Sequence, residues 1–356
     1  LTPYGVISQN SYEPESGNPY ATGSDQKLNF GLDGKVGVTN NLTLDFTINP
    51  DFGQVEADPS EVNLTAFESY FSEKRPFFIE GNSITSFNVG LGDGDVGNDN
   101  LFYSRRIGRR PQHSLSEDDG EYVKMPQFTP ILGAAKLTGK TENGLSVGVL
   151  EAVTADAKAM IESDGTERRE TVEPLTNYSL VRVQKDFNKG NTIIGAAATN
   201  VFRRTDGTEL DFLHRSATTT GVDLSQFFGE RNYVLNASLY VSNVAGTADA
   251  IARTQTSAAR YFQRPDASHL QVDSSLTSLE GTGGKLEFGK IGGNWNFMFM
   301  NVFKSPGLEI NDMGFMRQAD YMLNVLWTGY SFTEPFSIFR RLSLNNDVYL
   351  VSNFGG

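Results

Sequence analysis

The sequence contains no cysteine and only three histidines among its 356 residues. The absence of cysteine excludes disulfide frameworks, thiolate zinc sites, iron–sulfur clusters and cysteine nucleophiles. The histidines, His113, His214 and His269, are far apart, and none belongs to a His-Glu-x-x-His pattern. Each is expected on the surface or in a loop, and no cofactor is expected from these residue types.

Long apolar runs are missing as well. No stretch approaches the roughly 18 consecutive apolar residues of a membrane helix, which excludes a helical membrane protein. It does not exclude a membrane β-barrel, whose strands are apolar on one face only. Basic residues are outnumbered, 30 against 43 acidic, for a net charge of −13. Such an acidic chain repels phosphate backbones, so no nucleic-acid partner is expected.

The dominant feature that is present is an alternation of apolar and polar residues with period two. In residues 28–48 the apolar side chains occupy even positions on both sides of 39–41. This pattern predicts a β-hairpin. Pairing Val36 with Leu44 and Val38 with Leu42 requires an odd-length loop, so a three-residue turn with an asparagine in the left-handed conformation is expected.

The same pattern recurs and predicts thirteen strands. Val222, Leu224 and Phe228 are expected to face Leu239, Ala237 and Tyr233. The strands are expected near 1–10, 28–38, 42–48, 131–137, 145–153, 177–187, 192–202, 222–228, 233–239, 284–290, 294–304, 321–333 and 338–352.

Loop lengths alternate between short and long along the chain. Tight connections are expected near 39–41, 141–143, 188–191, 229–232, 291–293 and 334–337. Long polar ones are expected near 11–27, 51–127, 155–176, 203–215, 244–283 and 305–320. All tight turns then lie at one end of the strands, as in outer-membrane barrels. Strand-end aromatics could form interfacial girdles: Tyr178, Phe187, Phe228, Tyr233, Trp295, Phe303, Trp327, Tyr330 and Phe332. A soluble sandwich or propeller is the alternative.

The sequence therefore predicts an all-β fold, an antiparallel transmembrane β-barrel of the outer-membrane type. An odd number of strands does not close in the usual even-stranded manner, so the barrel is expected to be incomplete in this chain. Residues 1–50 hold the first strands, 51–127 an insert, and 128–356 the further strands. A helix is expected from Asp58 and Pro59, with Glu61 in a capping position, to just before Lys74.

The insert has its charges sorted by sign, and it is expected either to fill the lumen as a plug or to form an external loop. Carboxylates and guanidiniums that face each other in a lumen pair bidentately or create a transverse field that selects polar solutes. Salt bridges that hold the insert, a ligand site and a catalytic carboxylate pair are the three interpretations. The residues concerned are Asp51, Glu56, Asp58, Glu61, Arg105, Arg106, Arg109 and Arg110.

An acidic, glycine-rich loop over 93–100 offers closely spaced oxygen ligands. Asp93, Asp95 and Asp99 make it a calcium candidate, although it departs from the EF-hand pattern and a solvated turn is the alternative. Two further motif matches are set aside. Ser146 lies in a Gly-x-Ser-x-Gly sequence inside a predicted strand, and Lys140 in a phosphate-loop-like sequence is followed by a hairpin instead of a helix.

Three segments carry a resemblance to a known family: 46–84, 101–109 and 304–312. They resemble the family called domain of unknown function 5916, a family of outer-membrane barrels that commonly follow a domain similar to family 9 carbohydrate-binding modules. The resemblance implies a barrel in the outer membrane of a Gram-negative bacterium, with membrane lipid as a partner. It implies no activity, and since that preceding domain is absent from this sequence, sugar binding is not carried over.

Three functions remain open at this point. The first is a non-catalytic barrel that passes or docks a polar ligand, with residues 51–110 as gate or plug. The second is an accessory subunit that packs against other outer-membrane or periplasmic proteins. The third is a lumenal or surface hydrolase linked to carbohydrate. The sequence displays no convergent acid, base and metal constellation, so a non-enzymatic role is favoured.

Overall fold

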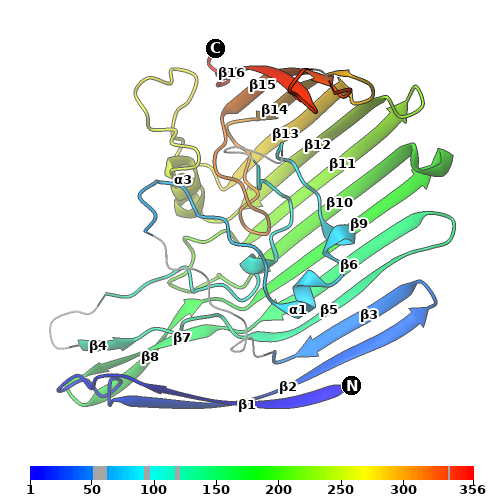
Figure 1. Cartoon of the computed structure of the whole chain (residues 1–356). Coiled ribbons are helices and arrows are strands. Elements are labelled where there is room, and N and C mark those ends of the chain that lie inside the picture. Colours follow the sequence, from blue (N-terminus) through cyan, green and yellow to red (C-terminus); the bar gives the residue numbers. More distant parts are fainter. Residues whose placement is uncertain (51–61, 92–96, 117–120, 336) are drawn as a thin grey trace.

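The computed structural model describes residues 1–50, 62–91, 97–116, 121–335 and 337–356. Thirteen antiparallel strands form one large sheet, in which almost every strand pairs with its neighbours in the sequence. Figure 1 shows the strands side by side from β1 to β16, with the tight hairpins gathered at one end. Within the described residues, β1 and β16 are the two edges of this sheet and do not pair with each other, so the sheet is open.

The strands of the large sheet are long, and most have ten or more residues. Their bounds are β1 Thr2–Ser11, β2 Ser24–Thr39, β3 Leu42–Ile48, β5 Ile131–Lys140, β6 Leu145–Thr154, β9 Thr176–Phe187, β10 Thr192–Arg203, β11 Ser216–Phe228, β12 Tyr233–Ala245, β13 Ser278–Lys290, β14 Trp295–Lys304, β15 Tyr321–Phe332 and β16 Leu342–Ser352. A short 3-10 turn, η3 (Asn188–Gly190), joins β9 to β10.

The all-β class and the thirteen predicted strands are confirmed, and so are several predicted pairs. Val222 pairs with Leu239 and Phe228 pairs with Tyr233, as their alternation indicated. The first hairpin differs from the prediction. Val36 pairs with Leu44, as predicted. Leu42 pairs with Thr39 instead of Val38, because a β-bulge between Gly37 and Thr39 shifts the register. Neither asparagine of the turn has a positive φ.

Two other predictions are wrong. The segment 155–176, expected to be a loop, carries most of a second, three-stranded antiparallel sheet, with β4 Glu121–Lys124, β7 Ala157–Ser163 and β8 Thr166–Glu173. The expected helix before Lys74 is absent over residues 62–73, where the chain makes few local backbone hydrogen bonds and is held by side chains that reach other segments. Its proposed start at Asp58, Pro59 and Glu61 lies outside the described residues.

The described helices are short and lie on one side of the large sheet (Figure 1). They are α1 Pro76–Ile79, α2 Asn82–Thr85, the 3-10 turn η2 Ser104–Arg106, and α3 Ala248–Thr256. Pro76 occupies the first turn of α1, where its missing N–H costs nothing. Gly81, with φ 72°, separates α1 from α2. No helix in the described part of the chain has both the length and the apolar character required to cross a membrane.

The two faces of the large sheet differ in character. One face, here called the covered face, lies under the insert and the long connections, and its side chains are buried, among them Lys136, Arg203 and Lys304. The opposite face, here called the open face, exposes apolar side chains. Val222 is 55% exposed and Leu239 is 52% exposed. The distribution of side chains over the two faces is therefore the opposite of that in a soluble protein: the charged side chains are buried, and many of the apolar ones are exposed.

Candidate functional site

The insert is seated on the covered face through its two short helices. Helix α2 contacts β5, β6 and β9. It approaches β6 at Gly148, where a Cβ atom would come within 3.1 Å of the Thr85 Cγ2 methyl group. Side chains longer than glycine at this position would push α2 away from the sheet. The close contact indicates that the insert is packed on the sheet.

Insert carboxylates and guanidiniums form the first part of the site. Arg106 is buried and donates to both carboxylate oxygens of Glu68, each at 2.7 Å. Its Nε donates to the Gly314 carbonyl at 2.9 Å, so one side chain ties the insert to the 305–320 connection. Bidentate pairs of this kind fix geometry as well as charge.

A second pair lies beside the first. Arg75 donates to Glu73 (2.7 Å between Nη2 and Oε2), and the Ser104 hydroxyl donates to the same carboxylate at 2.5 Å. Burial by itself would raise the pKa of Glu73, but these hydrogen bonds and the positive charge of Arg75 outweigh it and hold the pKa below its usual value. The Glu73 carboxylate is thus kept ionised inside the insert.

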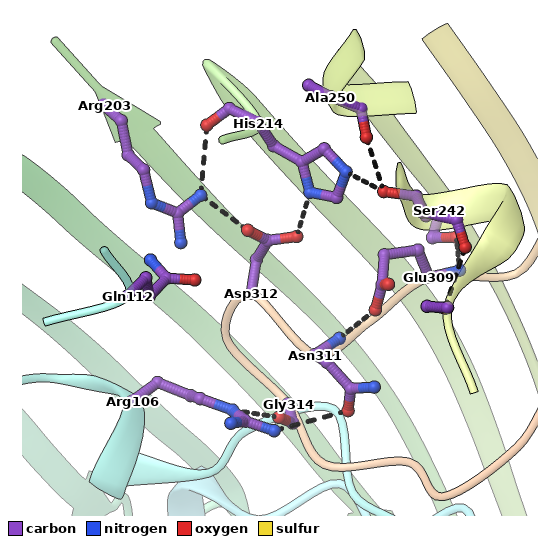
Figure 2. A network of polar contacts seen from close by, with 12 residues as sticks. Arg106, Gln112, Arg203, His214, Ser242, Ala250, Glu309, Asn311, Asp312 and Gly314 are labelled. Atoms are coloured by element: carbon purple, nitrogen blue, oxygen red, sulfur yellow. Dashed lines mark hydrogen bonds and ion pairs between the residues drawn. The ribbon is translucent and has the colours of Figure 1, made fainter. Parts of the chain in front are cut away.

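The centre of the site is a network around Asp312, drawn in Figure 2. Asp312 accepts from Arg203 Nη1 at 2.5 Å and lies 2.8 Å from His214 Nδ1, while His214 Nε2 lies 2.6 Å from the Thr254 hydroxyl. The Thr254 hydroxyl donates to the Ala250 carbonyl at 3.0 Å, so the network ends on helix α3. It joins strand β10, two connections and a helix at one carboxylate.

The electrostatics of Asp312 follow from this geometry. Desolvation opposes its charged form, but the His214 ring and the Arg203 guanidinium stabilise the carboxylate more strongly, so its pKa is far below the usual value. Arg203 is 1% exposed, and its Nε and Nη2 have no partner among the described residues. Removal of the Asp312 charge would leave this guanidinium buried without its counter-ion.

Two buried lysines of the large sheet also bind the insert. Lys304 of β14 pairs with Asp99, and both side chains are fully buried. Lys136 of β5 donates to the backbone carbonyls of Phe77 and Glu80 at the ends of α1. Burial raises the pKa of Asp99 above its usual value despite the nearby ammonium group of Lys304. Covered-face cations and insert acceptors therefore meet along several strands.

The residues predicted as a site are only partly within the described chain. Asp51, Glu56, Asp58 and Glu61 lie outside the described residues. Of the four arginines, Arg106 pairs with Glu68, and Arg105 donates to the Ser72 carbonyl at 2.9 Å. Burial, and then the charge of Arg106, lower the pKa of Arg109, whose Nε has no acceptor among the described residues. Arg110 is exposed. Pairing of these arginines with the early carboxylates stays a prediction.

The calcium candidate is likewise only partly visible. Asp93 and Asp95 lie outside the described residues, and the carboxylate of Asp99 is paired with Lys304. No group of three or more potential metal-ligating side chains occurs within the described ranges. Ser146 and Lys140 lie in strands on either side of a tight hairpin, as expected for motif matches without the corresponding chemistry.

Several of the central residues were not singled out by the sequence. Glu68 and Glu73 belong to the 46–84 segment but had no assigned role, and Thr254 carries no motif. His214 lies in a loop, as expected, but its side chain is only 11% exposed. Asp312 belongs to the 304–312 segment but had no assigned role. The sequence did contain one indication of this site. Arg182, Arg203 and Lys304 occupy positions in alternating strands that belong to the covered face.

Acidification is expected to loosen the insert and the connections packed on the covered face. Asp312 and Glu73 have lowered pKa values in the folded chain. Groups of this kind stabilise the fold above their unfolded pKa, about 4, and lose that contribution as the pH falls toward the folded pKa. The near-ultraviolet circular dichroism of the detergent-solubilised chain should hold from pH 7 to about pH 4 and decline below it. A signal unchanged down to pH 2 would contradict this.

Comparison with known proteins gives one family and several distant structures. The family model described as "Domain of unknown function (DUF5916)" matches residues 1–354. No curated protein matches the chain.

Three solved structures are similar to the chain. A refined porin has a TM-score of 0.34 at 11% identity, with 92% of this chain and 87% of the porin covered. Pseudomonas aeruginosa FpvA bound to a pyoverdine–iron complex has a TM-score of 0.30 at 12% identity, with 92% of this chain and 41% of FpvA covered. Pseudomonas aeruginosa OccK9 (OpdG) has a TM-score of 0.20 at 9% identity, with 98% of this chain and 92% of OccK9 covered. At these scores the likeness carries no argument.

Proposed function

The chain belongs to the family of domain of unknown function DUF5916, and from this membership and the two faces of its sheet we propose that it is an outer-membrane β-barrel protein. In this proposal the open face lies against lipid, and the insert occupies the covered face as a plug. The protein is non-catalytic and docks or passes a polar ligand at the plugged side.

The distribution of apolar and charged residues over the sheet is the observation that carries this proposal. On β9 to β12 the open face presents Val181, Ile194, Val222 and Leu239, each between 44% and 55% exposed. A soluble sheet that exposed such a continuous apolar area would be prone to association. Lipid covers it without cost, whereas the buried cations of the other face require the polar partners that the insert provides.

The height of the apolar region matches that of the apolar band of a membrane barrel. Aromatic rings gather at the tight-turn end: Phe228 of β11 stacks on Tyr233 of β12 with ring centres 5.5 Å apart, and the rings of Trp295 and Phe297, both on β14, lie 5.4 Å apart. Near the other strand ends the open face becomes polar, and Asn200 donates to Thr218 at 2.8 Å. About ten residues at a tilt of roughly 40° rise about 25 Å, the height of a barrel's apolar band.

Two members of the expected aromatic girdle lie elsewhere. Tyr178 is 2% exposed and belongs to the buried cluster of the covered face. Trp327 alternates with the exposed Leu326, so its side chain is on the covered face. The girdle expectation is wrong for these two residues. In the proposed membrane orientation, an aromatic residue at a strand end faces lipid only if it lies on the same face of the strand as the exposed apolar residues.

The lipid contact can be tested with the two tryptophans of the chain. In a Trp327→Phe variant, Trp295 is the only tryptophan, and it is 51% exposed on the open face. Reconstitution into vesicles of brominated phosphatidylcholine should quench its fluorescence by more than half relative to unbrominated vesicles. Aqueous iodide should quench it weakly. Strong iodide quenching with no effect of bromine would contradict the membrane location.

A specific observation favours a second candidate, an accessory subunit of a larger assembly. Strand β16 is exposed on both faces, because the adjacent residues Tyr349 and Leu350, which point to opposite faces, are 65% and 64% exposed. Its outer edge leaves backbone N–H and C=O groups without partners in the described chain. Inside a bilayer such an edge must be paired. Co-purification of another protein in fixed ratio after mild detergent extraction supports pairing with a partner, and its absence argues against it.

A further inference from the structure

The tight-turn end of the large sheet carries an excess of positive charge. The short connections at this end (Figure 1), taken with the strand residues beside them, are 39–41, 140–144, 185–192, 229–232, 290–295 and 333–341. Their basic residues are Lys140, Lys185, Lys189, Arg231, Lys290, Arg340 and Arg341, and their acidic residues are Glu142, Asp186, Glu230 and Glu334. In a chain of net charge −13, this end is therefore a local site of attraction for anions.

Most of these cations are open to a partner from outside the chain. Four of them are exposed: Lys189, Arg231, Arg340 and Arg341. Within the described residues, only Lys140 among the seven cations pairs with a carboxylate, that of Asp186. The chain itself thus provides counter-ions for the buried cations of the covered face but not for six cations at the tight-turn end.

Two of the lysines lie on the open face itself. Lys185 is two positions from the exposed Val183 on β9, and Lys290 is two positions from the exposed Phe288 on β13. Both ammonium groups point to the turns, since Lys185 donates to the Asn143 carbonyl and Lys290 donates to the Trp295 carbonyl at 3.0 Å. Lysines at the edge of an apolar membrane surface extend in this way toward the polar boundary. An ammonium group has three N–H donors, so each lysine keeps donors for a further acceptor.

Aromatic rings surround Lys290 on the open face. Phe228, Tyr233, Lys290 and Phe297 pair in one row across β11 to β14. The Lys290 ammonium group lies 5.8 Å from the centre of the Trp295 ring. Aromatic belts lie at the level of the lipid head groups, so this row would place the ammonium group of Lys290 at that level in a bilayer.

The opposite end of the open face carries carboxylates. Glu151 near the end of β6 accepts from Asn177, and Glu280 near the start of β13 accepts from Asn243 at 2.9 Å. Both glutamates are exposed. The open face is therefore polarised along its strands, with lysines at the tight-turn end and glutamates at the long-loop end.

We propose that the tight-turn end binds the head groups of anionic phospholipids, with Lys185 and Lys290 as the contacts on the open face. The phosphodiester supplies negatively charged acceptor oxygens to the ammonium groups, and the acyl chains cover the apolar residues below them. This inference rests on the proposed membrane location and names the lipid class that the tight-turn end selects.

Trp295 reports on this site because it lies beside Lys290. The Trp327→Phe variant is reconstituted in phosphatidylcholine vesicles in which a fixed minor fraction of the lipid is brominated, either phosphatidylglycerol or phosphatidylcholine. Brominated phosphatidylglycerol should associate near Trp295 about threefold more strongly than brominated phosphatidylcholine, as measured by quenching at matched fractions. High salt should reduce this preference, because it screens exposed charges. Equal quenching by the two lipids at low salt would overturn the proposal.

Two variants and one control assign the preference to Lys290. Lys290→Gln should remove at least half of the preference, and Lys290→Arg should retain it. The matched control is Lys285→Gln on the same strand, because the Lys285 side chain lies on the covered face, 3.8 Å from Glu287. This control changes the net charge equally and should leave the preference unchanged. A loss as large as that in Lys290→Gln would refute the assignment, and the salt series tests the proposal without any change at residue 290.

The two proposals fail separately in this experiment. Absence of quenching by both brominated lipids would remove the membrane location. Quenching of Trp295 by both lipids to the same extent would keep the membrane location and remove the selection of anionic lipid alone.

Discussion

Replacing Asp312 with asparagine is expected to lower the free energy of unfolding of the detergent-solubilised chain by about 3–5 kcal/mol. The substitution keeps the shape of the side chain but removes its charge, and Arg203, 1% exposed, then stays buried without a counter-ion. The same change breaks the link through His214 to helix α3. Chemical denaturation followed by near-ultraviolet circular dichroism measures the loss.

The matched control is Asp249→Asn. Asp249 also pairs with an arginine, at 2.8 Å, but both side chains are about 60% exposed. Surface pairs of this kind contribute roughly 0–1 kcal/mol. If the two substitutions cost the same, the Asp312 network does not hold the connections and α3 on the covered face, and the description of this site as a fastening is wrong.

The Asp312 network also bears on the passage of solutes, because the 305–320 connection that it holds is hydrogen-bonded to the insert, with the Tyr103 N–H donating to the Met313 carbonyl at 2.8 Å. If the insert acts as a plug, Asp312→Asn should raise ion conductance in planar bilayers relative to the unmodified chain. The stability and conductance readouts are independent, since a docking site without a pore would lose stability but show no change in conductance. Conductance therefore decides between the passing and the docking forms of the proposed function.

A lysine introduced on the open face should have an effect of similar size for a different reason. Val222→Lys places a charge in the middle of the apolar region, where lysine costs about 2–4 kcal/mol in a lipid-facing barrel position. The folded fraction in lipid vesicles over a urea series should fall accordingly. Val222 is 55% exposed, so the added side chain does not disturb a packed core.

Glu142→Lys provides the comparison for this second experiment. Glu142 is exposed in the tight turn between β5 and β6, beyond the apolar region. A lysine there remains in water and should leave folding in vesicles unchanged within about 0.5 kcal/mol, as is usual for surface substitutions. Equal effects at both positions would show that residue 222 does not face lipid.

Much of the sheet could be predicted from the sequence because its signal is local. Alternation over a strand and the length of the next turn determine which residues pair, as at Val222 and Leu239. The first hairpin shows the limit of this reasoning. A bulge between Gly37 and Thr39 changes the register without any change in composition, so a parity argument alone assigned the wrong partner to Leu42.

The candidate site was less predictable because its contacts are long-range. Arg203 and Asp312 are 109 residues apart, and Arg106 and Glu68 are 38 apart. No local pattern relates such residues, and the 62–73 segment takes its shape from these contacts and not from helix propensity. Arg182, Arg203 and Lys304 occupy covered-face positions of their strands, a pattern that was not used and that indicates polar cover for that face without saying which groups provide it.

Site-directed spin labelling along β11 tests the central claim, that lipid covers the open face while the insert covers the other. The chain has no cysteine, so single cysteines from Thr218 to Leu224 can be labelled one at a time. In vesicles, even positions should be accessible to oxygen and protected from a water-soluble nickel reagent, and odd positions should be protected from both. Ready access of the nickel reagent to the even positions would contradict the account.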